Sequence, residues 1–386
     1  MGLSAASAVV FFVTWFTART PWIGPSLTGC FLSLALAAST GQGPLRQLAF
    51  TIWIATGVVV GMANHHSFIM FPSWFFGLGN REMSVVFIPV LQIIMFAMGT
   101  TLSVADFTRV FKMPSGVLIG LGCQFTIMPL LGFGLAHAFG LPPEIAAGLV
   151  LVGCSPSGLA SNVMAFIAKA NVAMSVTMTA FSTLLAPLLT PLLMKMLAGE
   201  MVEIDVSEMM WSMTKIVLLP VLAGLVFHHL IYQRLKWLDR VMPVVSMIGI
   251  LIMTVLTVAV GRDKLMQVGP LLIVVCVIHS SAGFILGYFV CRILGRDKVT
   301  CRTIALEVGL QNAGMATGLA KTLGKVATLG LVPIVFGPVM NIIASMLANW
   351  WRAHPAEAGV SSQLAKDPDG QLEAYSTPNT QDSQAS

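Results

Sequence analysis

The sequence predicts an all-α integral membrane protein, and three observations carry this prediction. Only 10% of the 386 residues are charged and 56% are hydrophobic, whereas a soluble domain has about 25% charged residues. Eleven stretches of eighteen or more residues carry no Asp, Glu, Lys or Arg, and each could cross about 30 Å of hydrocarbon as a helix. Apolar and polar residues do not alternate at every second position, which excludes an outer-membrane β-barrel.

The chain divides into an N-terminal segment, a membrane domain and a polar tail. Residues 1–45 contain short apolar runs that predict one extra membrane helix or a hairpin, with a secretory signal as the alternative. Residues 46–352 form a ten-helix domain, with predicted spans at residues 47–65, 84–102, 114–139, 143–168, 172–197, 208–231, 242–260, 269–294, 300–322 and 326–351. The tail 353–386 is rich in Ser, Gln, Asp and Pro, so we expect it to be disordered.

The positive charges predict the orientation of these spans. If the loop 103–113 lies in the cytoplasm, twelve Lys and Arg residues fall on that side and six on the other, as the positive-inside rule requires. The same placement in short loops explains the net charge of +5 without a nucleic-acid partner. The absence of a targeting signal favours a bacterial inner membrane.

An internal repeat relates the two halves of the membrane domain, residues 46–197 and 207–352. Asn162 in span four and Asn312 in span nine lie 150 residues apart in similar motifs, and an Ala-Lys pair follows each motif. Because each half has five spans, an odd number, the halves must lie in opposite orientations. This is the inverted repeat of secondary transporters.

Glu307 is the one acidic residue well inside a predicted span. A carboxylate at the bilayer centre costs at least ~2.5–3.5 kcal/mol, so it needs a partner or a function. Lys215, one to two turns inside span six, is the nearest candidate for a salt bridge. The other interpretation is a cation or proton site.

Small and amide residues interrupt spans four and nine at corresponding places. Ser-Pro-Ser-Gly occupies residues 155–158, and two glycines and two amides follow Glu307 within residues 308–314. Such segments can unwind at the membrane midplane and free their carbonyl oxygens, which together with carboxylate, amide and hydroxyl oxygens suit Na⁺. The resumed half-helices begin with free N–H groups that suit an anionic substrate. Two broken helices that cross therefore predict a symporter site.

Three motifs together resemble the bile acid:sodium symporter family. They are Gly-Cys-Ser-Pro-Ser-Gly-Leu-Ala-Ser-Asn-Val-Met at 153–164, Gln-Phe-Thr-Ile-Met-Pro at 124–129 and Glu-Val-Gly-Leu-Gln-Asn at 307–312. The resemblance covers about residues 45–352. It implies a panel domain of spans one, two, six and seven, and a core domain of the other six spans, in which spans four and nine are broken and cross.

The resemblance also implies two Na⁺ sites that share Glu307. The first would consist of the side chains of Ser161, Asn162, Ser175, Thr179 and Glu307. The second would consist of Gln124, Gln311, Glu307 and the carbonyl groups of Val308 and Leu310. Substrate contacts would fall on Leu159, Ala160, Asn312 and Asn341. Leu159 stands where the family commonly has a small or hydroxyl residue, which leaves the substrate open.

These residues predict a sodium-coupled symporter that imports an organic anion, such as a bile acid, a 2-oxo acid or a pantoate-like acid, by alternating access. Na⁺ would be the coupling ion, and no other cofactor is expected. Proton coupling at Glu307 and an uncoupled carrier or channel of the same fold are the alternatives. An intramembrane enzyme is disfavoured, because the sequence has no His-Glu-x-x-His motif, paired aspartates or Ser/His constellation.

Overall fold

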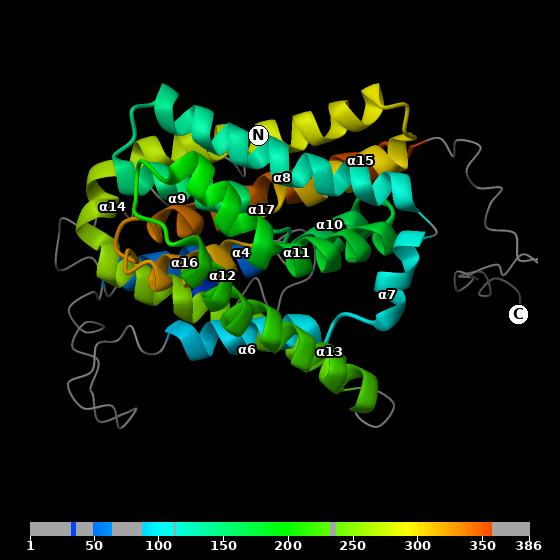
Figure 1. Cartoon of the computed structure of the whole chain (residues 1–386), viewed down its shortest axis with the longest axis horizontal. Helices are drawn as coiled ribbons and strands as arrows, with labels where there is room; N and C mark the ends of the chain where they lie inside the picture. Colours follow the sequence, from blue (N-terminus) through cyan, green and yellow to red (C-terminus); the bar gives the residue numbers. More distant parts are fainter. Residues whose placement is uncertain (1–31, 36–48, 64–86, 112, 232–236, 357–386) are drawn as a thin grey trace, which may run out of the picture.

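The computed structural model describes residues 32–35, 49–63, 87–111, 113–231 and 237–356, and the regular structure within these ranges is helical (Figure 1). The elements are α4 (Ala49–Ala63), α6 (Phe87–Gly99), α7 (Val104–Thr108), the 3₁₀ turn η2 (Arg109–Phe111), α8 (Pro114–Ala138), α9 (Pro143–Cys154), α10 (Ala160–Ile167), α11 (Val172–Ala198), α12 (Val206–Met213), the π-helical segment η3 (Thr214–Leu218), α13 (Leu219–Ile231), α14 (Leu238–Ile293), α15 (Lys298–Gly309), α16 (Ala313–Thr322) and α17 (Leu331–Ala353). The predicted N-terminal hairpin and polar tail lie outside the described residues, apart from 32–35 and 353–356.

Most of the predicted spans coincide with one helix or with two consecutive helices. Five helices of the described part are long and apolar enough to cross a membrane, and α6 with α7–η2 forms a pair bent by 71° that could count as a sixth. Spans four and nine are each broken into two helices, α9 and α10 in one case and α15 and α16 in the other. The breaks fall at residues 155–159 and 310–312, where the sequence predicts them.

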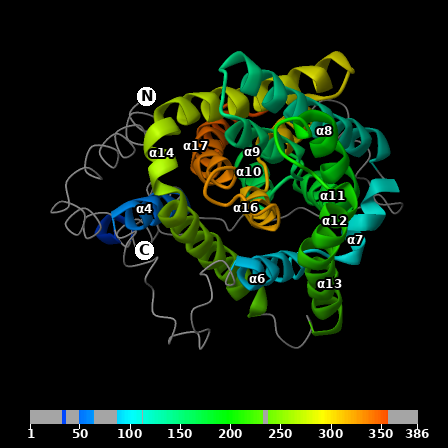
Figure 2. The same cartoon turned by 60° about the vertical axis from the view of Figure 1, so that its left-hand side comes forward.

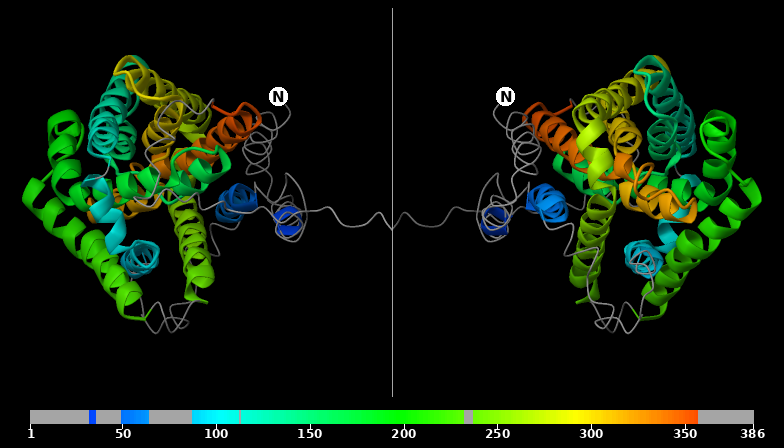
Figure 3. Two further views of the ribbon diagram at one scale, coloured as in Figure 1. Left: turned by 90° about the vertical axis from the view of Figure 1, so that its right-hand side faces the viewer. Right: turned by 90° about the vertical axis from the view of Figure 1, so that its left-hand side faces the viewer.

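Helix α14 differs from the prediction. The sequence predicts two spans with a charged loop at residues 261–268, whereas α14 is helical through all 56 residues. Gly261, Gly269 and Pro270 border this segment, and such residues bend a membrane helix without ending it. A straight helix of this length would measure about 84 Å, but the views show that α14 changes direction between its halves (Figures 2 and 3). Each half is therefore long enough to cross the membrane.

The half-helices α10 and α16 lie in the middle of the molecule, between α11 on one side and α17 on the other, and the second half of α14 runs beside α8 (Figure 2). Helices α6 and α13 pack closely on each other, and α6 also contacts α16, where a Cβ atom on Gly318 would collide with Leu91. A Cβ atom on Gly224 would collide with the carbonyl oxygen of Phe96, and one on Gly99 would collide with the backbone of Val221. Small residues of this kind let two membrane helices approach at backbone distance.

Candidate functional site

The two helix breaks meet and satisfy each other's backbone groups. Ser157 and Gln311 form an antiparallel bridge, the Asn312 N–H donates to the Pro156 carbonyl at 2.8 Å, and the Gly158 N–H donates to the Leu310 carbonyl at 3.2 Å. A Cβ atom on Gly158 would lie 3.1 Å from the Gln311 carbonyl oxygen, so a glycine permits this close approach. The pairing explains how unwound backbone is stable at membrane depth, where water is not available to satisfy it.

Glu307 lies in the last turn of α15, fully buried beside this crossing. The Ser175 hydroxyl donates to one carboxylate oxygen, and the Thr179 hydroxyl donates to the other at 3.0 Å. Ser175 and Thr179 are four residues apart on α11 and share one face of that helix. The structure thus brings together residues from α15 and α11 as the resemblance implies.

Helix α10 adds the amide of Asn162 and the hydroxyl of Ser161 to this cluster. The Ser175 hydroxyl lies 2.8 Å from Asn162 Oδ1, and Ser161 Oγ lies 3.3 Å from Thr179 Oγ1 while donating to the Gly158 carbonyl at 2.8 Å. The hydroxyls of Ser175 and Thr179 thus lie between the Glu307 carboxylate and Asn162 Oδ1. A cluster of carboxylate, amide and hydroxyl oxygens suits a hard cation.

A second polar group lies on the other side of the crossing. The Gln124 amide of α8 donates to the Ser155 carbonyl at 2.9 Å and to Gln311 Oε1 at 2.8 Å. The Gln311 amide donates in turn to the Val308 carbonyl. Gln124 Oε1 is buried and has no hydrogen-bond partner among the described residues. An unsatisfied buried acceptor costs about 1–3 kcal/mol, which a cation beside it would recover.

The remaining carbonyl group of the predicted second site belongs to Leu310. Its oxygen accepts the Gly158 N–H, and a carbonyl oxygen keeps a second lone pair for another partner. Gly309, between the two carbonyls, leaves no room for a side chain, because a Cβ atom there would collide with the ring of Phe284 on α14. The sequence did not single out Phe284, since an aromatic residue in an apolar span carries no signal of what it packs against.

The predicted substrate residues surround the crossing but do not form one contiguous group. Asn312 caps α16 by accepting the Met315 N–H at 3.0 Å, and its amide lies 3.9 Å from Met98 Sδ on α6. Leu159 and Ala160 are half-buried at the start of α10. Asn341 of α17 is buried, and its amide donates to the carbonyl of Gly337, four residues earlier in the same helix.

The salt-bridge alternative for Glu307 is wrong. Lys215 lies over the Trp211 ring at 4.6 Å, and the ion pairs of the described residues do not include Glu307. Lys215 also sits in the π-helical segment η3, away from the crossing. The carboxylate is therefore held by neutral groups, which leaves its negative charge available to a cation.

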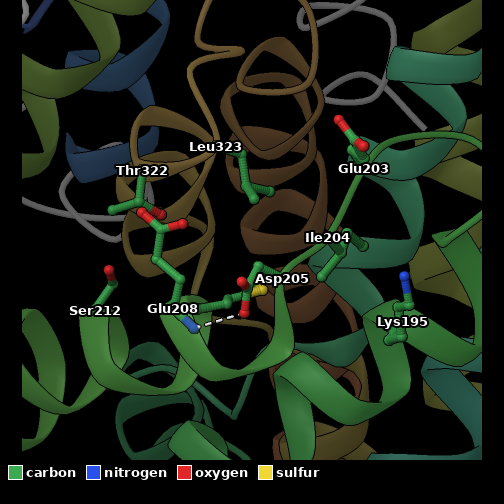
Figure 4. A pocket seen from close by; sticks show the side chains of 9 residues that line it. Lys195, Glu203, Ile204, Asp205, Glu208, Ser212, Thr322 and Leu323 are labelled. Atoms are coloured by element: carbon green, nitrogen blue, oxygen red, sulfur yellow. Dashed lines mark hydrogen bonds between the residues drawn. The ribbon is translucent and has the colours of Figure 1, made fainter.

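A polar cavity of about 580 Å³ lies away from the crossing, where the ends of α11 and α16 face the start of α12 (Figure 4). Its lining residues are Lys195, Glu203, Ile204, Asp205, Glu208, Met209, Ser212, Thr322 and Leu323. Hydrogen bonds from the Ser207 hydroxyl and the Glu208 N–H lower the pKa of the Asp205 carboxyl. The cavity carries more acidic than basic side chains and lies on the side that the charge pattern places outside the cell.

The chain is similar to one protein family and to individual proteins within it. Residues 88–268 match the family described as "Sodium Bile acid symporter family". A Bacillus subtilis (strain 168) protein described as "Uncharacterized sodium-dependent transporter YocS" is 39% identical over 303 residues, which are 78% of this chain and 90% of that protein.

Two eukaryotic relatives match a comparable share of this chain at lower identity. The Arabidopsis thaliana protein described as "Probable sodium/metabolite cotransporter BASS1, chloroplastic" is 36% identical over 80% of this chain and 75% of its own length. The "Ileal sodium/bile acid cotransporter" of Cricetulus griseus is 30% identical over 76% of this chain and 87% of its own length.

Proposed function

Because this chain belongs to the sodium bile acid symporter family, we propose that it is a sodium-coupled symporter that imports an organic anion. It is a multi-pass membrane transport protein and not an enzyme, since its relatives are transporters and five of its described helices can span a membrane. The observation that carries the proposal is the buried Glu307 carboxylate, whose hydrogen-bond partners are hydroxyl groups.

In this proposal, Glu307 is shared by two Na⁺ ions. The first ion is held by the side chains of Ser161, Asn162, Ser175, Thr179 and Glu307. The second is held by Glu307, Gln124, Gln311 and the carbonyls of Val308 and Leu310, with the unsatisfied Gln124 oxygen as its main support. One carboxylate then offsets part of the charge of both ions, and an anionic substrate offsets more.

Alternating access would arise from movement between two groups of helices. We assign α4, α6, η3, α12, α13 and the first half of α14 to a panel domain, and the remaining long helices to a core domain. The close packing of α6 on α13 supports the panel, and the crossing supports the core. The two domains would be formed from two inverted repeats of five spans. The cavity of Figure 4 lies between α12 of the panel and α11 and α16 of the core, so we assign it as the outer entrance.

The substrate would bind where the crossing faces the panel. The Asn312 amide lies against Met98 of the panel helix α6, and the N-termini of α10 and α16 offer positive dipole ends to an anion. Relatives described as sodium/bile acid and sodium/metabolite cotransporters support an organic anion as the class. We place the protein in the cell membrane of a bacterium, with uptake directed inward.

Uptake into proteoliposomes should require Na⁺ and should be supported poorly by Li⁺. The reason is that carboxylate, amide and hydroxyl oxygens, which are hard ligands, converge on Glu307. The measurement is uptake of radiolabelled carboxylates with Na⁺, Li⁺ or choline outside, with and without a proton gradient. If uptake is unchanged in choline with a proton gradient, sodium coupling is contradicted and Glu307 is a proton site.

Thr179→Ala should raise the Na⁺ concentration for half-maximal uptake about tenfold and leave the substrate KM nearly unchanged. The substitution removes one oxygen from the Glu307 cluster and leaves the α11 backbone intact. Asn341→Ala, as the matched variant on α17, should instead raise the substrate KM with little change in the sodium requirement. Equal effects of both variants on sodium activation would contradict this division of roles.

A further inference from the structure

Five cationic side chains gather where α14 ends, α15 begins and α17 ends. They are Arg292, Arg296, Lys298, Arg302 and Arg352. Asp297 is the one acid within residues 286–302 and 346–356, so these three helix ends carry a net charge of 5 − 1 = +4. In Figure 1 the ends of α14 and α17 lie near each other beside α15. We call this surface the basic cluster.

Hydrogen bonds and ring contacts join α14, α15 and α17 at the basic cluster. The Arg302 guanidinium of α15 donates to the Trp351 carbonyl at 3.2 Å and to the His354 carbonyl at 2.6 Å, and it lies over the Trp351 ring. Tyr288 of α14 stacks on the same ring at 5.9 Å between centroids. Arg292, one turn beyond Tyr288, donates to the Arg296 carbonyl at 2.7 Å.

The positive charge of the basic cluster is not neutralised by the described part of the protein. Arg302 is only 6% exposed, and the ion pairs of the described residues do not include it. The Nε–H groups of Arg296 and Arg302 are buried and have no acceptor among the described residues. The carbonyls of Trp351 and His354 hold the Arg302 guanidinium, but no carboxylate of the described residues pairs with it, so the positive charge of the basic cluster is available to a bound anion.

Asp297 does not serve as that anion. Its carboxylate accepts the Val299 and Thr300 N–H groups, both at 2.9 Å, and the Thr300 hydroxyl at 2.6 Å. It therefore caps the N-terminus of α15, which also complements the positive end of the helix dipole.

Apolar side chains flank the basic cluster on the outer surface of the same helices. Ile293 is 82% exposed, and Phe289, Leu294 and Trp350 are each more than half exposed. Aromatic residues next to cationic ones at the end of a membrane helix are typical of the boundary between headgroups and acyl chains. An anion that binds the basic cluster from this boundary is therefore the headgroup of a lipid.

We propose that the basic cluster is a binding site for the phosphate group of an anionic phospholipid. Arginines bind phosphate with two parallel N–H donors, and Arg292 and Arg296 supply such donors at the edge of the buried Arg302. The acyl chains would lie along the exposed side chains of Phe289, Ile293 and Leu294. The charge pattern places the site on the cytoplasmic side, where anionic lipids attract clusters of basic residues. The proposal is independent of the sodium assignment.

The test is a thermal unfolding experiment on the purified full-length protein in neutral detergent. Phosphatidylglycerol should raise the Tm saturably, whereas phosphatidylcholine with the same acyl chains should raise it little. The double variant R292Q/R296Q should need at least fivefold more phosphatidylglycerol for half the effect. The matched control K215Q/K264Q also removes two positive charges, one exposed and one half-buried, but from elsewhere on the surface, and should behave as wild type.

Native mass spectrometry adds a count of retained lipids, and a cooperative unfolding transition near the wild-type Tm in lipid-free detergent checks that each variant is folded. Fewer phosphatidylglycerol molecules retained by R292Q/R296Q, with that transition intact, supports the site. Equal stabilisation by both lipids, or equal losses in both double variants, overturns it. An equal Tm shift with inorganic phosphate at the same concentration also overturns it, because the site would then recognise an anion without its acyl chains.

Discussion

Glu307→Gln is expected to abolish sodium-coupled uptake and not merely to lower the affinity for Na⁺. Glutamine keeps the size of the side chain but removes the one negative charge that both proposed ions share. Without it, two Na⁺ ions would repel each other in a poorly solvated site, where Coulomb energies are several-fold larger than in water. The substrate anion offsets only part of that repulsion.

Thermal unfolding with and without Na⁺ separates this effect from misfolding. Wild type should gain stability with Na⁺ by mass action, about 2.7 kcal/mol at one hundred times the dissociation constant. Glu307→Gln should fold with normal or higher stability in the absence of Na⁺, because an unpaired buried carboxylate destabilises the empty carrier, and should gain nothing from Na⁺. Glu200→Gln, at an exposed acid outside the polar cavity, is the matched control, and it should keep both uptake and sodium stabilisation. A Glu307→Gln variant that transports and is stabilised by Na⁺ would place the coupling ions elsewhere.

Gly309→Ala is expected to weaken sodium activation at least tenfold. Alanine normally stabilises a helix relative to glycine by up to about 1 kcal/mol, so propensity alone predicts a benign change. A Cβ atom at this position, however, would overlap the Phe284 ring. The resulting shift would displace the Val308 and Leu310 carbonyls, on either side of Gly309, from the second proposed Na⁺ site.

A double-mutant cycle tests this explanation. Adding Phe284→Ala to Gly309→Ala removes the ring and should restore most of the sodium affinity, although it lowers the stability of the fold by several kcal/mol, as truncation of a buried Phe does. Gly314→Ala is the matched control, because the nearest atom to its added Cβ lies at 3.5 Å, an ordinary contact. Sodium activation that stays weak in the double variant would show that the Phe284 contact is not the cause.

The broken helices illustrate what local sequence predicts well. Pro156 has no N–H for a helical hydrogen bond, and Gly158 leaves room where a Cβ atom would lie 3.1 Å from the Gln311 carbonyl oxygen, so the break in span four follows from residue chemistry. Helix α14 illustrates the opposite case. A charged segment between two apolar runs predicts a loop, but the helix continues through residues 262–268, which Gly261, Gly269 and Pro270 border, and the chain turns by bending.

Sequence by itself determined the all-α membrane class, most of the spans, the two breaks and Glu307 as the one acid inside a span, because each depends on composition or on residues close together in the chain. Only the tertiary structure decided which groups meet that acid. Ser175 and Thr179 lie 132 and 128 residues from Glu307 along the chain, and Gln124 lies 187 residues from Gln311. Helical periodicity predicts which residues share a face but not which helix that face will contact. That choice depends on how α8, α10, α11 and α15 pack around the crossing, and so on the whole fold.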